Sequence, residues 1–141
     1  MIECSRELLA PRPDVWALVA QPFHLPDWWP AYLGVEPDRL ALAEGARWKV
    51  RRARAPGFLR RPEGEGLIVI RRVLDGTELA WHDVQQRLDA GVRLAAAGPV
   101  RTTANAWVDG PWWRLNAEGA RGLPRGALER LHALCQTAAS P

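Results

Sequence analysis

The sequence predicts a single α+β domain in which an antiparallel sheet packs against one long helix near the C-terminus. The chain has 141 residues, which suffices for one domain with a core of its own. Most of it consists of short runs that alternate apolar and polar residues between Gly, Pro and Asp turns. Only residues 123–138 show sustained helical periodicity. Consecutive strands covered by one terminal helix form an α+β fold.

Seven strands are expected. Residues 2–9 alternate in the manner of a half-buried strand, and the apolar run after Gly66 is closed by Asp75-Gly76, a hairpin turn signal. Asp109-Gly110-Pro111 is interpreted as a second hairpin turn. The predicted strands are residues 2–9, 33–43, 46–54, 65–73, 78–88, 100–108 and 112–119.

Prolines divide the segment after the first strand into two short helices. Pro11 and Pro13 suit a first helical turn, where the missing N–H has no intrahelical partner, and Pro22 ends this helix. Pro26 can begin a second helix, which Pro30 ends. Helices this short are unstable alone, so the three tryptophans in this segment are expected to dock them on the rest of the domain.

Charge and cysteine content limit the classes of function. The net charge is +3, and the segment 47–61 holds seven basic residues and no acid, so the basic character is local. Cys4 and Cys135 lie at opposite ends and the three histidines are scattered, so we expect free thiols, no metal site and no cofactor. The N-terminus lacks the pattern of a secretory signal and no apolar run has transmembrane length, which favours a cytoplasmic protein.

The order of elements and the stretch "APRPDVWALVAQPFHLPDWWP" resemble the START-like superfamily, which includes polyketide cyclase/aromatase, birch-pollen-allergen and Hsp90-activator types. The matching positions are Ala10-Pro11, Val15-Trp16, Gln21-Pro22 and Trp29-Pro30, followed by Gly45, Trp48 and Leu79-Trp81. The resemblance implies a helix-grip fold over residues 1–141, a curved seven-stranded antiparallel sheet around the C-terminal helix with an apolar cavity between them. The predicted helix is shorter than is usual in the superfamily, which implies a shallower cavity.

Strand and helix periodicity indicate which side chains would face this cavity. The candidates are Trp28, Trp48, Val50, Leu79, Trp81, Trp107, Trp113, Leu115, Leu128, Leu131 and His132. An aromatic wall with a few polar groups is typical of a small-molecule site. Alternatively, the large rings fill the cavity and no ligand binds.

Acid–base chemistry would need a titratable group inside the cavity. His132 is the candidate, because helical spacing places it on the apolar face, although a hydrogen-bonded core histidine fits that position equally. Asp83 and Arg6 lie on inward faces by alternation, and His82 lies on an outward face. No catalytic motif of an enzymatic branch is recognised.

The resemblance places the basic segment in a loop that gates the cavity. Its residues are Arg54, Phe58, Leu59, Arg60 and Arg61, an apolar tip flanked by arginines. Such a tip suits an anionic membrane surface or an acidic carrier protein. A solvated charged hairpin remains the alternative, and nucleic acid is the least favoured partner because no aromatic residues interleave the arginines on a known module.

Binding of an apolar or amphipathic small molecule in a tryptophan-rich cavity, for transport or sequestration, is the leading hypothesis for function. Two alternatives stay open. One is an enzyme of the polyketide cyclase/dehydratase type, a lyase. The other is a protein-interaction module of the Hsp90-activator or toxin-component kind.

Overall fold

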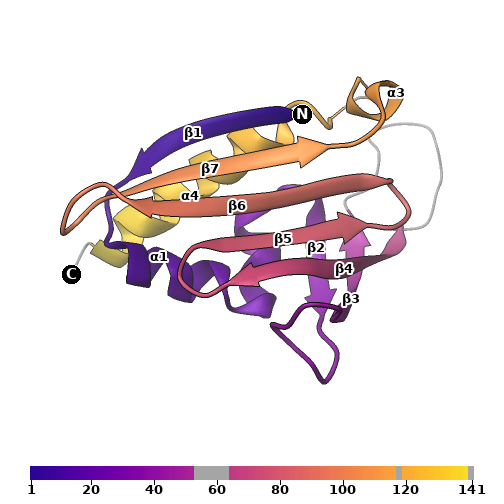
Figure 1. The fold of residues 1–141 in the computed structure, drawn as a ribbon, viewed down its shortest axis with the longest axis horizontal. Coiled ribbons are helices and arrows are strands. Elements are labelled where there is room, and N and C mark those ends of the chain that lie inside the picture. Colours follow the sequence, from indigo (N-terminus) through magenta and orange to yellow (C-terminus); the bar gives the residue numbers. More distant parts are fainter. Residues whose placement is uncertain (53–63, 117–118, 140–141) are drawn as a thin grey trace.

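Seven antiparallel strands form one curved sheet that packs against a C-terminal helix (Figure 1). The structure is a computed structural model, and it describes residues 1–52, 64–116 and 119–139. The strand order is β1-β7-β6-β5-β4-β3-β2, so the first strand lies beside the last. The strands are β1 (Ile2–Leu8), β2 (Tyr32–Glu36), β3 (Arg47–Arg52), β4 (Glu65–Leu74), β5 (Glu78–Asp83), β6 (Leu88–Ala96) and β7 (Thr102–Asp109).

The proline-bounded segment forms the predicted short helices. They are α1 (Arg12–Val19), the 3₁₀ turn η1 (Pro22–His24) and α2 (Leu25–Trp28). Proline occupies the first turn of each, where its fixed φ is already helical. Trp16 ties α1 to the β4–β5 turn, because its indole Nε1 donates to Asp75 Oδ1 at 3.1 Å. Docking by tryptophan, predicted from the sequence, therefore includes a hydrogen bond as well as packing.

The long helix α4 (Leu123–Ala139) packs on β1, β7 and α2. Leu128 and Leu131 of this helix belong to the hydrophobic core, which the inner faces of all the strands share. Gly126 lets α4 approach the end of α2, since a Cβ at this position would lie 3.0 Å from Cγ of Pro30. None of the described helices is both long and apolar enough to cross a membrane.

The curved seven-stranded antiparallel sheet with its terminal helix confirms the predicted fold class. Among the described residues, one predicted strand is absent and one observed strand was not predicted. The predicted strand 112–119 is not one: Pro111 begins the short helix α3 (Trp112–Leu115). The strand that completes the seven is β6, which was not predicted. The predicted strand 78–88 ends at Asp83, because residues 84–87 form a tight turn in which Arg87 adopts a left-handed φ of 54°.

The second predicted strand was also too long. β2 ends at Glu36 rather than near residue 43, because Pro37 and Asp38 begin a turn. The carboxylate of Asp38 stabilises that turn by accepting hydrogen bonds from the backbone N–H groups of Leu40 and Arg47. Side-chain bonds of this kind compete with the sheet ladder.

Candidate functional site

A cavity of about 350 Å³ lies between the inner face of β5–β7, the α2–β2 corner and the start of α4. One part of its wall is apolar and another part carries charged and polar side chains. Its lining residues are Trp29, Ala31, Tyr32, Arg52, Trp81, Asp83, Gln86, Leu88, Ala90, Val108, Arg114, Gly119, Ala120 and Leu123. This division into an apolar and a polar side is typical of small-molecule sites.

The polar side is centred on Asp83, the last residue of β5. Its side chain is 6% exposed and accepts hydrogen bonds at both oxygens. Tyr32 Oη donates to Oδ2 at 2.8 Å, while Oδ1 accepts from Arg52 Nη2 and, at 3.1 Å, from the backbone N–H of Gln86. Trp81 Nε1 in turn donates to Tyr32 Oη at 3.3 Å. The buried carboxylate is thus paired with a cation and held by neutral donors, as a buried charge requires.

Burial controls the protonation of Tyr32. Removal of the phenol from water raises its pKa well above the ordinary value, and the adjacent Asp83 carboxylate raises this pKa further. The phenol therefore stays protonated at neutral pH and donates to the carboxylate. In the folded protein Tyr32 is a neutral hydrogen-bond donor and not a base.

Arg52 reaches Asp83 across the backbone of β4. A Cβ at Gly66 would lie 2.6 Å from Arg52 Nη2 and 2.9 Å from Cζ, so the absence of a side chain at Gly66 leaves room for the guanidinium. Arg52 Nε is buried and has no hydrogen-bond partner among the residues that the structure describes. Among the described residues, the Asp83 carboxylate is the group that pairs with this cation.

Three tryptophans form a buried cluster behind the apolar side of the cavity. Trp28, Trp29 and Trp81 contact one another edge to face, with ring centroids 5.0–6.0 Å apart. Trp29 and Trp81 line the cavity, whereas Trp28 lies behind them in the core. Edge-to-face contacts fix ring orientation, so this wall is rigid.

Arg114 of α3 supplies a second cation to the cavity. Its Nε donates to the backbone oxygen of Gln86 at 2.9 Å, and its Nη2 donates to the side-chain oxygen of the same residue. No carboxylate within the described part of the chain forms a salt bridge with Arg114. Arg114 therefore differs from Arg52, whose charge Asp83 neutralises.

The structure brings only Trp81 of the predicted cavity residues to this cavity. The fully or nearly buried core contains Trp28, Trp48, Leu79, Leu115, Leu128 and Leu131, where the rings and aliphatic side chains pack on one another. His132 is half-buried on α4 and does not line the cavity. Trp113 is half exposed, because the segment that was predicted as a strand is the helix α3.

Trp107 lies on the opposite face of the sheet from the predicted one. Ala104, Ala106 and Val108 are the core residues of β7, so the alternation points Trp107 outward. Its ring covers Gly91 of β6 and lies 5.1 Å beneath the Arg93 guanidinium. The ring is 8% exposed because these neighbours cover it, which explains how a large apolar residue occupies an outer face.

The structure also places other charged and titratable residues that the sequence analysis considered. Asp83 points inward, as alternation indicates, and His82 is half-buried on the outer face, where its Nδ1 lies 2.9 Å from Asp89 Oδ1. Arg6 lies on the inward face of β1, as alternation indicates, because it pairs with the core residue Ala104 of β7, but its side chain is exposed. The proposed gate residues Arg54, Phe58, Leu59, Arg60 and Arg61 lie outside the described residues, so membrane or carrier-protein binding there stays a prediction. Among the described residues, no three His, Cys, Asp or Glu side chains gather as metal ligands.

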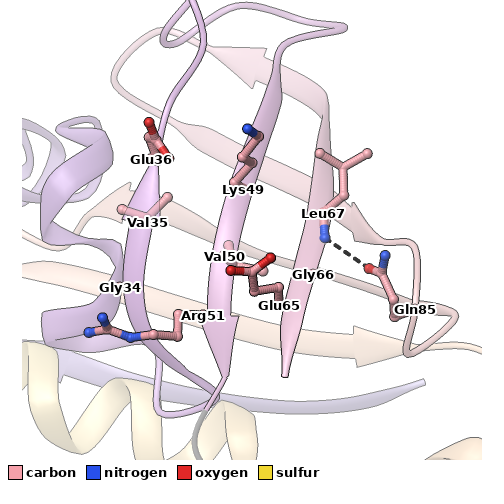
Figure 2. A pocket seen from close by; sticks show the side chains of 10 residues that line it. All are labelled: Gly34, Val35, Glu36, Lys49, Val50, Arg51, Glu65, Gly66, Leu67 and Gln85. Atoms are coloured by element: carbon pink, nitrogen blue, oxygen red, sulfur yellow. Dashed lines mark hydrogen bonds between the residues drawn. The ribbon is translucent and has the colours of Figure 1, made fainter. Parts of the chain in front are cut away.

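A second hollow of about 630 Å³ lies over the strands β2, β3 and β4 (Figure 2). The predicted residue Val50 is one of its lining residues. Charged side chains of both signs surround it, with Glu36 and Lys49 on paired positions of β2 and β3. The hydrogen bond from the Leu67 N–H to Gln85 Oε1, 2.8 Å long, closes one side. The described residues that line this hollow include no aromatic ring and no buried ionisable group, so the cavity beside Asp83 is the better candidate site.

Sequence reasoning missed four polar residues of the site, Tyr32, Arg52, Gln86 and Arg114. Arg52 could have been found, because it shares the inward face of β3 with Trp48 and Val50 at two-residue spacing. Arg114 was hidden by the wrong strand over 112–119. Tyr32 and Gln86 lie at a strand end and in a turn, where periodicity carries no signal.

Comparison with solved structures places this architecture among known folds. Norcoclaurine synthase from Thalictrum flavum, in complex with dopamine and hydroxybenzaldehyde, aligns with a TM-score of 0.64 at 14% identity over 99% of this chain and 88% of that one. The di-domain ARO/CYC protein BexL of the BE-7585A biosynthetic pathway aligns with a TM-score of 0.69 at 13% identity, over 100% of this chain and 48% of BexL. A protein from Thermobifida fusca aligns with a TM-score of 0.72 at 17% identity, over 98% and 94% of the two chains.

The chain thus has the helix-grip fold that these solved structures share. At these identities the likeness shows the fold alone. No protein-family model matches the sequence, and no curated protein matches it. The cavity and its residues must therefore carry any statement about function.

Proposed function

We propose that the protein binds a compact small molecule in the cavity that Trp81 and Asp83 line, for transport or sequestration. The observation that carries this proposal is the division of the cavity wall. Trp29, Trp81 and Leu88 offer an apolar surface, while the largely buried side chains of Arg52 and Asp83 form a polar surface. A ligand with an apolar or aromatic body and one polar end would match both surfaces.

The size and rigidity of the site support a small, specific ligand. About 350 Å³ lies at the lower end of the volumes of small-molecule pockets, which suits a single aromatic or short aliphatic body more than a long lipid. The edge-to-face tryptophans and the Tyr32–Asp83 hydrogen bond hold the wall in one arrangement. A preorganised wall reduces the entropy that binding must offset. The neighbour norcoclaurine synthase, which is described in complex with two small aromatic molecules, supports the same size class.

Acid–base catalysis is a second candidate, favoured by one observation. Asp83 is a buried carboxylate in the wall of a ligand-sized cavity, beside a phenol that stays protonated. A reacting group would have to compete with Arg52 and Tyr32 for the carboxylate oxygens, which makes binding the better-supported function. Turnover of a bound carbonyl compound that Asp83→Asn abolishes, while binding persists, would favour the enzyme.

Ala90 offers a direct test of binding. It lines the cavity opposite Trp81 on the neighbouring strand, and the larger side chain of Ala90→Leu would extend into the cavity. Ala95→Leu is the matched control, because Ala95 lies exposed on the same strand. Tryptophan fluorescence is the readout, since Trp29 and Trp81 contact the ligand directly. We expect small aromatic molecules to change the fluorescence of the wild type and Ala95→Leu, and this response to be lost in Ala90→Leu. An equal response in all three proteins would place binding elsewhere.

A further inference from the structure

We propose that the cavity selects a ligand with one negative charge, carried by a carboxylate or a similarly small anionic group that pairs with Arg114. This inference rests on the proposed function, because it assigns the charge of the ligand that the same cavity would hold. It concerns the polar end of the ligand, whereas the proposed function concerns its body.

The charges of the lining residues do not balance. Within the described ranges 1–52, 64–116 and 119–139, the cavity wall carries two guanidinium groups, of Arg52 and Arg114, and one carboxylate, of Asp83. Of the described lining residues, Tyr32 is the only other titratable one, and it adds no charge because burial and the neighbouring carboxylate keep its phenol protonated. The part of the wall that the structure describes therefore has an excess of one positive charge, which an anionic ligand would neutralise.

Asp83 offers little to a cationic ligand. Both of its oxygens already accept hydrogen bonds, from Tyr32 at Oδ2 and from Arg52 and the Gln86 N–H at Oδ1. The Arg52 cation also neutralises its charge. An ammonium group entering the cavity would have to displace one of these donors and would meet the uncompensated charge of Arg114.

Arg114 lines the cavity and keeps N–H donors with which it can bind an anion. Its Nε and Nη2 are held by the two oxygens of Gln86, which are neutral acceptors and leave the guanidinium charge in place. A guanidinium has five N–H donors in a fixed plane, so Arg114 keeps donors for a carboxylate after these bonds are made. Gln86 also binds Asp83 through its backbone N–H, which fixes Arg114 relative to the polar cluster. A carboxylate at Arg114 thus lies at the polar side of the cavity while its apolar body can reach Trp81.

Three probes with one body and different polar ends test this inference. They are phenylpropionate, its neutral amide phenylpropionamide, and the cation phenylpropylamine, titrated into the intact protein by calorimetry. We expect the carboxylate to bind at least about 10-fold more tightly than the amide, because a charge-assisted hydrogen bond is worth about one order of magnitude in affinity. We expect the amine to bind most weakly.

The outcomes separate this inference from the proposed function. Equal affinity for the carboxylate and the amide, or preference for the amine, would overturn the anionic assignment and leave the proposed binding site intact. No binding of any probe up to millimolar concentration would overturn both.

Variants of Arg114 assign the charge effect to this residue. Arg114→Gln should lower the affinity for the carboxylate more than the affinity for the amide and so remove the preference for the carboxylate. Arg114→Lys should restore part of the preference, because it keeps the charge and loses the planar donor set. Arg101→Gln is the control, since Arg101 is exposed and pairs with Glu7 outside the cavity. A preference that survives in Arg114→Gln, with the fold intact by circular dichroism, would overturn the assignment to Arg114.

Discussion

The phenol of Tyr32 donates a 2.8 Å hydrogen bond to the carboxylate of Asp83 across 51 positions of the sequence. Tyr32 begins the edge strand β2, whereas Asp83 ends the central strand β5. The bond therefore links the corner that the proline-bounded helices form to the centre of the sheet. It also connects the tryptophan cluster with the charged side of the cavity, through the bond from Trp81 Nε1 to the same phenol.

Removal of this phenol should destabilise the protein. In Tyr32→Phe the buried groups Asp83 Oδ2 and Trp81 Nε1 each lose a hydrogen-bond partner. A buried polar group left without its partner costs about 1–3 kcal/mol, so we expect the free energy of unfolding in urea to fall by that amount. A loss below about 0.5 kcal/mol, with an unchanged urea dependence, would show that the bond contributes little.

Alkaline pH should lower stability through the same residue. Because the pKa of Tyr32 is higher in the folded than in the unfolded protein, the unfolded chain loses the phenolic proton first as the pH rises. Tyr32 makes its full contribution to the free energy of unfolding below a pH of about 10. Above that pH the contribution declines, by up to about 1.4 kcal/mol per pH unit, until the phenol of the folded protein titrates too. Tyr32→Phe lacks this group, so its stability should depend less steeply on pH between about 10 and 11. Parallel curves for the two proteins would contradict the raised pKa.

Gly66 should act as a positioning residue for Arg52. In Gly66→Ala the new Cβ would occupy the space of the Arg52 guanidinium and move it away from Asp83. We expect a loss of about 1–3 kcal/mol in the free energy of unfolding, because a buried carboxylate would lose its cation. Gly64→Ala is the matched control, since a Cβ there would meet Arg52 Cβ at an ordinary 3.9 Å. Equal effects of the two substitutions would show that the space at Gly66 is unimportant.

Gly91 should tolerate no side chain beneath Trp107. A Cβ at Gly91 would lie 2.4 Å from Cζ2 of the Trp107 ring and 2.7 Å from the backbone oxygen of Leu79, which is fixed in the neighbouring strand. We therefore expect Gly91→Ala to lower the free energy of unfolding by about 1–3 kcal/mol, as other overpacked sites do. Adding Trp107→Ala should not restore stability, because the contact with Leu79 remains. Full recovery in the double variant would contradict this explanation.

The sequence predicted the fold more completely than the site, for physical reasons that particular residues illustrate. The prolines around Trp16 and Trp29 predicted both short helices correctly, since a proline restricts its own backbone wherever it occurs. The strand 112–119 was wrong because Trp112 and Trp113 suit a strand by composition, while the turn at Pro111 begins a helix instead.

The site depends on contacts that no local pattern contains. Tyr32, Arg52 and Asp83 come from three strands, and β2 and β5 are separated in the sheet by β3 and β4. Alternation could place Asp83 on the inward face, but it could not reveal that Tyr32 would reach it. Alternation likewise could not distinguish tryptophans that fill the core, such as Trp48, from Trp81, which borders a cavity.

The most direct measurement of ligand binding in the cavity is a titration with phenylpropionate, followed through the indole N–H resonances of the ¹⁵N-labelled protein. Trp81 lines the cavity and its Nε1 donates to Tyr32, so a bound ligand should shift its resonance. Trp112, which is 76% exposed on α3, provides an internal reference. Binding in the cavity predicts saturable shifts of Trp81 and Trp29 that Ala90→Leu abolishes, with little change at Trp112. Shifts at Trp112 and Trp113 alone, with Trp81 unmoved at saturation, would contradict it.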